Sequence, residues 1–323
     1  MGMTFDYSYD LFGVKFHLAT NSFRIAAEAQ MFLEEHQTGR HSLPDYRFVF
    51  AESATMPDFG VPNLRTCQGH EHQIIEYGGC VFLSTAEGMA RFDPKNKTCQ
   101  GHVFPLHNDP GKPSGTVPLI HLLIIRIMFA EGFLPFHAAA AVDRRGETVV
   151  LSGEKGAGKS TLAIKLHQLG FQPLCDDLVY LRPEHNRLMA GGHCQAVKIK
   201  TPEAGPLLKS CLTAQGEAQV IGKTLFPIQQ FNPDGVNRLY PVGTMIFLDN
   251  TAACATHANV LPDQEVEVFR HLLETSSQIN TPACRARALE FFCNAGRCRF
   301  FLAQTSTDPD ITVNEILRAL DHA

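Results

Sequence analysis

The sequence predicts an α/β protein in which a smaller β-rich N-terminal domain, residues 1–113, precedes an α/β domain at residues 114–323. Three observations lead to this prediction. The first hundred residues alternate apolar and polar positions in short runs. The segment 107–115 then breaks all periodicity and is typical of a linker. Beyond it, an apolar strand, a glycine-rich loop and an amphipathic helix follow one another between residues 148 and 169.

In the N-terminal domain we expect mostly antiparallel strands and one helix near residues 22–35. In the second domain the expected helices are 119–131, 159–169, 266–275 and 312–320. The expected strands are 138–142, 148–151, 173–180 and 241–248. The first two are joined by a connection short enough for a hairpin. Between about residues 188 and 230 the pattern is irregular and predicts loops, one of which could face a substrate.

The composition is that of an ordinary globular protein, with 44% hydrophobic and 19% charged residues in 323. A net charge of −5, with His neutral, offers no broad cationic surface, so nucleic acid is not an expected partner. The N-terminal residues lack a secretory signal, and the ten cysteines are therefore expected as reduced thiols in a cytoplasmic protein. The most apolar stretch, 117–133, is interrupted by charges and predicts a buried helix rather than a membrane span.

Residues 153–160 match the pattern G-x-x-x-x-G-K-[ST] completely, with a strand before the motif and a helix after it. The glycines let backbone N–H groups converge on a phosphate, and the helix presents its positive end to the same anion. Lys159 can reach the β- and γ-phosphates of ATP, and the Ser160 hydroxyl can ligate Mg²⁺. The expected nucleotide-binding residues are Gly153, Glu154, Lys155, Gly156, Ala157, Gly158, Lys159, Ser160 and Thr161.

Asp176 and Asp177 end an expected strand, 17 and 18 residues after Lys159. One helix and a turn fill this interval, which is the span that brings the next strand beside the loop. One carboxylate could hold Mg²⁺ while the other accepts a proton from an attacking hydroxyl, although a solvated strand end would look the same. A competing metal carboxylate is Asp249, which follows four apolar residues but also reads as a plain turn.

The order of His137, the glycine-rich loop, Gly170 and the Asp176–Asp177 pair resembles the catalytic domain of HPr kinase/phosphorylase and its relatives. Phosphoenolpyruvate carboxykinase shares the nucleotide-binding core more distantly. The resemblance covers roughly residues 137–180. It implies an α/β P-loop kinase domain of the HPr kinase and phosphoenolpyruvate carboxykinase type.

The resemblance also implies a Mg-ATP-dependent kinase that phosphorylates a hydroxyl, often a serine of a protein or peptide. By position, Lys159 holds phosphates, Ser160 and Asp177 hold the metal, and Asp176 is favoured as the base. His137 lies near the transferred phosphoryl group, or else is a buried structural histidine. The resembling family forms hexamers, which is compatible with a homo-oligomer.

One departure concerns the family's second signature, Glu-x-Arg-Gly-x-Gly, which this sequence lacks. The corresponding region is 191–200, where Lys198 and Lys200 could approach the phosphates or lie on the solvent side of a strand. The departure argues against HPr as the acceptor and against the reverse phosphorylase reaction. The chain looks more like relatives in biosynthetic clusters, including kinases that modify peptide precursors.

The pentapeptide Thr-Cys-Gln-Gly-His occurs at residues 66–70 and again at 98–102. Two Cys-x-x-His units could assemble a four-ligand zinc site. The spacing is unusual for zinc ribbons, and two similar strand-edge turns would give the same repeat.

We therefore expect a kinase for a hydroxyl of a peptide or protein, with acceptor recognition by the N-terminal domain. A kinase for a small molecule would use the same site. A regulatory module that binds nucleotide without transferring phosphate is the alternative of another class. The retained Asp176 and Asp177 argue against it, because a sensor does not need a proton acceptor.

Overall fold

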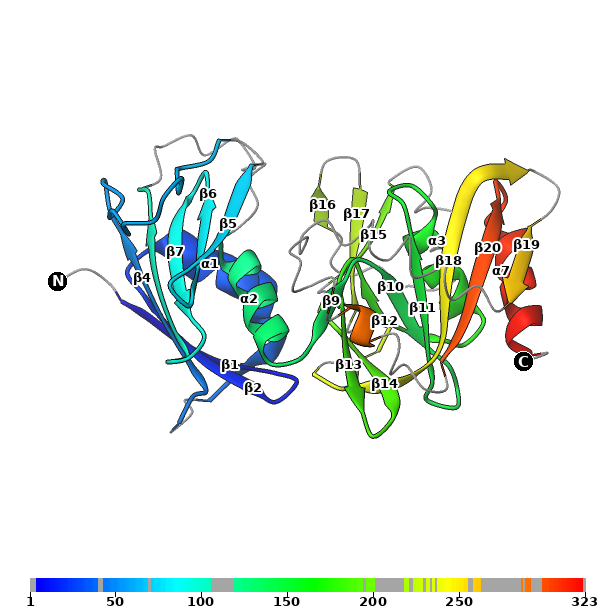
Figure 1. Cartoon of the computed structure of the whole chain (residues 1–323). Helices are drawn as coiled ribbons and strands as arrows, with labels where there is room; N and C mark the ends of the chain where they lie inside the picture. Colours follow the sequence, from blue (N-terminus) through cyan, green and yellow to red (C-terminus); the bar gives the residue numbers. More distant parts are fainter. Residues whose placement is uncertain are drawn as a thin grey trace. The chain divides into compact units, whose positions relative to one another are not determined.

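The structure is a computed structural model that describes residues 4–39, 43–68, 71–105, 119–193, 196–200, 218–220, 223–228, 231–232, 234–235, 237–254, 258–262, 286, 288–291 and 298–321. The expected linker at 107–115 and the expected helix at 266–275 lie outside these residues. The chain divides into two compact units, Met1–Gly132 and Phe133–Ala323, which are described separately (Figure 1).

Unit 1 is a sheet of eight strands in the order β3-β1-β2-β4-β8-β7-β6-β5. Its strands are β1 (Phe5–Leu11), β2 (Val14–Thr20), β3 (Gln37–Thr38), β4 (Tyr46–Glu52), β5 (His72–Tyr77), β6 (Cys80–Thr85), β7 (Gly88–Asp93) and β8 (Thr98–Val103). The pairs β2–β4 and β4–β8 are parallel, and the other neighbouring strands are antiparallel. The expectation of a mostly antiparallel β-rich region is confirmed.

Two helices, α1 (Phe23–Leu33) and α2 (Leu119–Ala130), belong to the same unit, and a short 3₁₀ turn, η1 (Glu34–His36), follows α1. Ser22 caps α1 by accepting a hydrogen bond from the Ile25 amide. Along β4 the residues Tyr46, Phe48 and Phe50 are buried and alternate with exposed ones, so one face of the sheet forms the core.

The division between the units falls after Gly132, not between residues 113 and 114, because α2 packs on β6, β7 and α1. The Glu131 carboxylate, just beyond α2, accepts hydrogen bonds from the Tyr46 hydroxyl at 2.6 Å and from Lys97 Nζ at 2.8 Å. Nine residues of α2 are buried, as expected for a core helix. In the part of the chain that the structure describes, no helix is long and apolar enough to cross a membrane.

Unit 2 is built on a sheet of nine strands. These are β9 (Leu134–Phe136), β10 (Ala139–Val142), β11 (Thr148–Gly153), β12 (Gln172–Asp176), β13 (Val179–Glu184), β14 (Arg187–Gly192), β18 (Tyr240–Cys254), β19 (Asn259–Pro262) and β20 (Arg299–Ser306). The expected hairpin of β10 and β11 is confirmed. β18 runs parallel to β11 on one side and to β20 on the other. A second sheet holds β15 (Ala196–Lys200), β17 (Lys223–Pro227) and β16 (Ala218–Val220).

Two helices, α3 (Lys159–Gln168) and α7 (Pro309–Asp321), share one hydrophobic core with strands β10, β11, β18 and β20. Leu162 and Leu166 of α3 and Val313 and Ile316 of α7 are buried in it. An ion pair of 2.6 Å between Lys165 and Asp310 joins the two helices at their rim. These contacts hold α3, the helix that follows the glycine-rich loop, against α7 and the sheet.

Three expected features of unit 2 are wrong. The irregular region contains β14 and the small sheet in addition to loops, because His185 and Asn186 adopt positive φ angles that close a tight hairpin from β13. The strand expected at 241–248 continues to Cys254, pairing with β20, so Asp249 is not part of a turn. The strand expected at 173–180 is two strands, β12 and β13, interrupted at Asp177.

Candidate active site

The glycine-rich loop, residues 153–160, leaves β11 and enters α3, as the motif predicts. Gly153 has a φ of +152°, and a Cβ atom there would lie 2.7 Å from the Leu248 carbonyl oxygen on β18. A residue with a side chain would therefore clash with rigid backbone. Gly158, with a φ of +90°, caps α3 in the left-handed conformation. These glycines turn the chain sharply enough to place the helix N-terminus over the strand end.

Lys159 lies inside the curl of the loop. Its Nζ donates hydrogen bonds to the carbonyl oxygens of Gly153 at 2.8 Å and Glu154 at 3.0 Å, and the side chain is buried. The neighbouring residues Glu154, Lys155 and Gly156 are exposed, whereas Ala157 is buried and Thr161 is half-buried. The ammonium group is thus held at the centre of the anion-binding turn by the backbone of the turn itself.

Ser160 and Asp176 form the second contact of the site. The Ser160 hydroxyl donates a hydrogen bond of 2.7 Å to Asp176 Oδ1, and Asp176 is only 2% exposed. The carboxylate lies at the end of β12, which pairs with β10. In the sheet β10 lies between β12 and β11. Asp176 still reaches the loop, since α3 begins above the same edge of the sheet.

Two neighbouring stretches of chain, β9–β10 and β12–β13, are each interrupted at the same level of the sheet, and this shared break positions His137 and Asp177. β9 and β10 are separated by His137 and Ala138, and β12 and β13 by Asp177 and Leu178. On one side of the break Phe136 pairs with Val179, and on the other Ala139 pairs with Asp176. The Asp177 amide donates to the Ala138 carbonyl across the gap at 3.1 Å. The break therefore turns adjacent carboxylates in different directions, with Asp176 buried and Asp177 half-exposed.

His137 and Asp177 face each other across this break. His137 Nδ1 lies 2.9 Å from the Asp177 carbonyl oxygen and 4.0 Å from its carboxylate oxygen Oδ1. A carbonyl can only accept, so Nδ1 carries a proton and Nε2 is the acceptor in the neutral ring. The side chains are 42% and 44% exposed. Asp177 has a φ of +135°, which is strained for a non-glycine residue and typical of functional positions.

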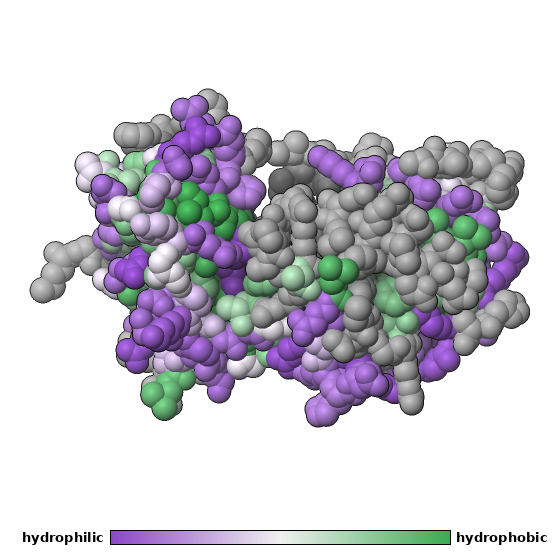
Figure 2. Space-filling model, in the orientation of Figure 1, coloured by the Kyte–Doolittle hydropathy of each residue, from purple (hydrophilic) through white to green (hydrophobic). Residues whose placement is uncertain are grey.

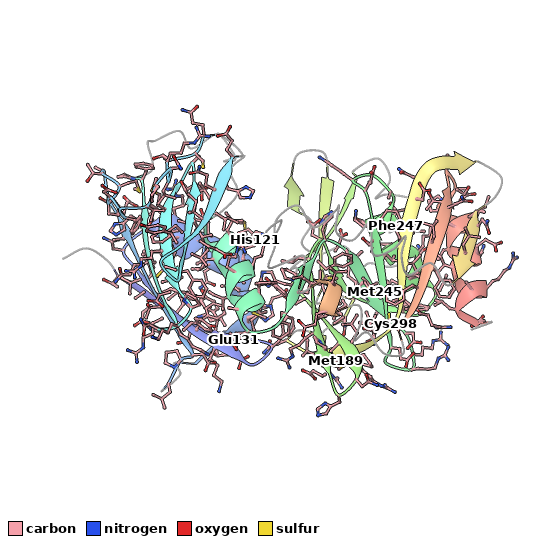
Figure 3. The ribbon with its side chains drawn as sticks, in the orientation of Figure 1. His121, Glu131, Met189, Met245, Phe247 and Cys298 are labelled. Atoms are coloured by element: carbon pink, nitrogen blue, oxygen red, sulfur yellow. The ribbon has the colours of Figure 1, made fainter. Side chains whose placement is uncertain are left out.

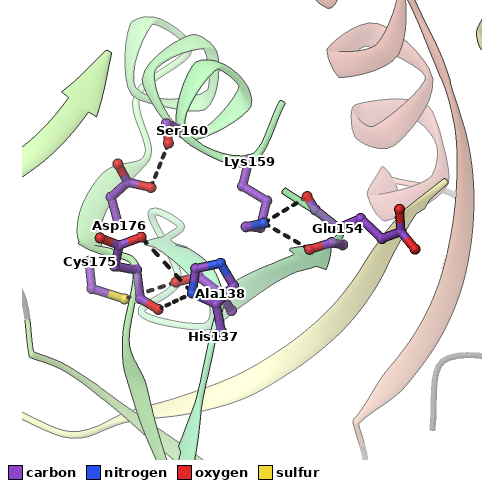
Figure 4. A network of polar contacts seen from close by, with 9 residues as sticks. His137, Ala138, Glu154, Lys159, Ser160, Cys175 and Asp176 are labelled. Atoms are coloured by element: carbon purple, nitrogen blue, oxygen red, sulfur yellow. Dashed lines mark hydrogen bonds and ion pairs between the residues drawn. The ribbon is translucent and has the colours of Figure 1, made fainter. Parts of the chain in front are cut away.

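The structure thus brings together His137, Lys159, Ser160, Asp176 and Asp177 at one edge of the sheet (Figure 4). The contact of Ser160 with Asp176 and the placement of His137 beside Asp177 could not be read from the sequence. The feature that marks this arrangement is the positive φ angle of Asp177, which is a backbone property and leaves no pattern in the sequence.

Other sequence candidates lie elsewhere or outside the description. Asp249 follows Leu248, the residue that pairs with Gly153, so it stays near the same edge as a half-buried residue. Lys198 and Lys200 lie on β15, whose side chains are outside the described residues.

The two pentapeptides adopt different structures. The second lies on β8, where Cys99 is buried and His102, three positions later, points to the other face of the sheet. Of the first, Cys67 is a buried free thiol, and Gly69 and His70 lie outside the described residues. Within the described residues there is no cluster of His, Cys, Asp and Glu that could hold a metal ion. Cys67, Cys80, Cys99, Cys175 and Cys298 are free thiols.

No family model matches the chain. The curated protein HPr kinase/phosphorylase from Bordetella petrii is 29% identical to it over 169 residues, which are 51% of this chain and 48% of that protein. The chain therefore spans about half the length of this curated relative.

Among solved structures, the chain is similar to the Hpr(Ser) kinase/phosphatase from Coxiella burnetii, with 16% identity and a TM-score of 0.33. This match covers 58% of the chain and 97% of that structure. At so low a TM-score the structural likeness carries no argument, and the relationship rests on the sequence match. Over about half of its length, the chain is similar to a curated HPr kinase/phosphorylase.

Proposed function

We propose that the chain is a kinase that transfers the γ-phosphoryl group of Mg-ATP to a hydroxyl, in particular a serine hydroxyl of a peptide or protein. The observation that supports this most is the pair of adjacent carboxylates beside the P-loop, one buried against Ser160 and the other exposed next to His137. A site that only binds nucleotide requires the first carboxylate but not the second.

Ser160 and Asp176 fit a Mg²⁺ ion that is bound together with ATP. Mg²⁺ prefers oxygen ligands, and in nucleotide sites it uses one or two protein groups, with phosphates and water completing the set. Ser160 supplies a hydroxyl and Asp176 a carboxylate, 2.7 Å apart, with Asp176 buried and Ser160 half-buried. Bound there, Mg²⁺ would neutralise charge on the β- and γ-phosphates.

The geometry supports a reversal of the two aspartate roles that the family resemblance favoured. Asp176 is tied to the metal-ligating hydroxyl, so we assign it to the metal together with Ser160. Asp177 is half-exposed and accessible to an acceptor from solvent, so we assign it as the base. In the transfer step the acceptor oxygen bonds to the γ-phosphorus while the bond to the ADP oxygen breaks, and the acceptor proton passes to Asp177.

His137 acts in this proposal by positioning Asp177. Its Nδ1–H donates to the Asp177 carbonyl and holds the strained backbone in place. When the ring is protonated, it also places positive charge 4.0 Å from the carboxylate. His137→Asn should therefore slow transfer less than loss of the carboxylate does.

Two variants separate the carboxylate roles. Asp177→Asn should keep Mg-ATP affinity and slow single-turnover phosphoryl transfer by about 10²-fold or more, because the base is lost. Asp176→Asn should weaken the Mg²⁺-dependent part of ATP binding in calorimetric titration. Asp321→Asn, at an exposed carboxylate that ends α7, is the matched control. Wild-type transfer rates in both variants would show that the pair is structural and that the proposed kinase mechanism is wrong.

The acceptor class needs its own experiment. The purified protein should transfer label from γ-labelled ATP to a serine-containing peptide or protein library. Replacement of the acceptor serine by alanine should abolish labelling. Labelling of a small-molecule hydroxyl library alone would favour the small-molecule kinase, and specific ATP binding without any transfer would favour the regulatory module.

A further inference from the structure

A cavity of about 240 Å³ opens at the end of the unit 2 sheet that lies away from the P-loop. Its lining includes Arg145, Glu147, Arg187, Pro241, Gly243 and Arg299. Glu147 immediately precedes β11, Gly243 lies near the start of β18, and Arg299 opens β20. These strands run parallel, so the cavity sits at their N-terminal ends while the P-loop follows the C-terminal end of β11.

The two ends are well separated. The six residues of β11 rise by about 3.3 Å each, which gives a separation of about 20 Å. In Figure 3, Met245 lies between Cys298, at the cavity, and Phe247, towards the P-loop end. A ligand in the cavity could not touch the γ-phosphate of a nucleotide in the loop.

The cavity carries an excess of positive charge. Three arginines and one glutamate line it, and Asp143 pairs with Arg145, so the formal charge is three positive minus two negative, a net +1. Burial raises the pKa of the Cys298 thiol to about 12, so this lining residue stays neutral at ordinary pH. The tip of the β13–β14 hairpin, where Arg187 lies, forms part of a hydrophilic surface (Figure 2).

The guanidinium groups are incompletely matched by acceptors of the protein. Arg299 Nη2 donates to Thr244 Oγ1 at 3.1 Å, and its guanidinium carbon lies 5.9 Å from the centre of the Phe301 ring. Its Nη1 is buried, and no described residue accepts a hydrogen bond from it. Arg187 is exposed, and no described residue forms an ion pair with it. Arg145, which is 75% exposed, pairs with Asp143 at 3.4 Å.

We propose that this cavity is a second anion site, which binds a small molecule bearing a doubly charged oxyanion such as a phosphate group. Arginine forks match the oxygens of phosphate in pairs, and the two forks of Arg187 and Arg299, which form no ion pair with a described residue, suit a dianion better than a monoanion. The volume is smaller than that typical of drug-sized ligands and suits a small metabolite. Glu147 repels a second anionic group and favours a ligand whose remaining part is uncharged or donates hydrogen bonds.

Calorimetric titration of inorganic phosphate tests this site, with the P-loop disabled by Lys159→Ala in every protein used. The Lys159→Ala protein should bind one phosphate. Adding Arg187→Gln should weaken that binding by about tenfold, because one charge-assisted contact is lost. Arg318→Gln, an exposed arginine of α7 outside the cavity lining, is the matched control and should change affinity less than about twofold.

A second variant and a second probe keep the test decisive. Arg299→Lys keeps the charge but loses the planar fork, and it should also weaken phosphate binding. Malonate, a dianion, should compete with phosphate, whereas acetate at equal ionic strength should not. Absence of phosphate binding in the Lys159→Ala protein, or binding unchanged by both Arg187→Gln and Arg299→Lys, would overturn the proposal.

Discussion

The two ends of the parallel strands in unit 2 are built in different ways. At the C-terminal end of β11, the anion-binding groups come from one continuous stretch, residues 153–160, supported by Asp176 and Asp177. At the N-terminal end, the arginines come from three separate segments, at residues 145, 187 and 299. Backbone amides and a helix N-terminus surround the first site, whereas side chains alone supply the charge of the second.

This difference explains why the site at the C-terminal end can be predicted from the sequence and the site at the N-terminal end cannot. A loop that wraps a phosphate with its own backbone needs fixed spacing between glycines, lysine and hydroxyl, so it leaves a contiguous pattern. Arginines that meet only when β11, β14, β18 and β20 are assembled need no particular spacing. The comparison predicts that variants at the two ends have separate effects.

The largest effect is expected at Lys159. Lys159→Ala removes the ammonium that the loop holds at its centre and should lower ATP turnover by about 10³-fold without unfolding the protein. Lys155→Ala is the matched control, because Lys155 is exposed in the same loop. Steady-state ATP turnover measures both variants, and an unchanged rate in Lys159→Ala would remove the P-loop from the mechanism.

Substitution of one glycine at each end of the strands compares how rigid the surrounding atoms are at the two ends. In Gly153→Ala the new Cβ would meet the Leu248 carbonyl oxygen at 2.7 Å with a φ of +152°, and we expect a loss of about 2–4 kcal/mol in unfolding free energy. In Gly243→Ala the Cβ would meet the flexible end of the Glu147 side chain at 2.6 Å, and the loss should stay below about 1 kcal/mol.

Chemical denaturation of the two glycine variants, read by circular dichroism, provides the measurement. Equal losses would mean that the two ends tolerate added volume alike. The contrast between rigid backbone and mobile side chain would then not hold.

A truncation tests whether unit 2 alone is sufficient for ligand binding at both ends of its parallel strands. Residues 133–323, which begin at the boundary between the units, should keep ATP affinity within about twofold and keep phosphate binding at the arginine cavity. If unit 1 recognises the acceptor, phosphorylation of that acceptor should fall by at least about tenfold. Unchanged acceptor phosphorylation by the truncated protein would show that unit 1 is not needed for recognition.

A further expected effect concerns pH and lies in unit 1. Burial, the neighbouring Glu87 charge and a hydrogen bond that the protonated Glu28 carboxyl donates to Glu87 together raise the pKa of Glu28 to about 8. A raised carboxyl pKa means that the folded state binds the proton more tightly, so this stabilisation is lost as pH rises from about 4.5 to about 8.

The slope should not exceed about 1.4 kcal/mol per pH unit. Denaturation at several pH values should show the decline in the wild type and a flatter dependence in Glu28→Gln, which cannot ionise. The same dependence in both proteins would place the titrating group elsewhere.

Much of the fold was predictable, and the errors share a cause. The helices α1, α2, α3 and α7 and the β10–β11 hairpin follow from periodicity, capping and turn residues, which act within a few positions. The errors concern β12, β14 and β18, whose limits depend on pairing with distant strands. β18 continues beyond Leu248 because β20 pairs with it, and β12 stops at Asp176 because its partner ribbon breaks at His137.

The candidate site divides in the same way. The motif predicts Lys159 and Ser160 by spacing, and the resemblance adds His137 and the aspartate pair. Which aspartate is buried against Ser160 could not be predicted, because alternation in an unbroken strand says only that the two point apart. The positive φ of Asp177 and the hydrogen bond across the break to Ala138 decide it.

By itself, the sequence determined that a glycine-rich loop with the P-loop pattern lies between a strand and a helix, since that pattern depends on local backbone geometry. Only the tertiary structure decided the environments of Asp176 and Asp177, the end of unit 1 after α2, and the meeting of three distant arginines. Contacts between residues far apart in the chain depend on how the strands are ordered in the sheet. No local pattern of residues records that order.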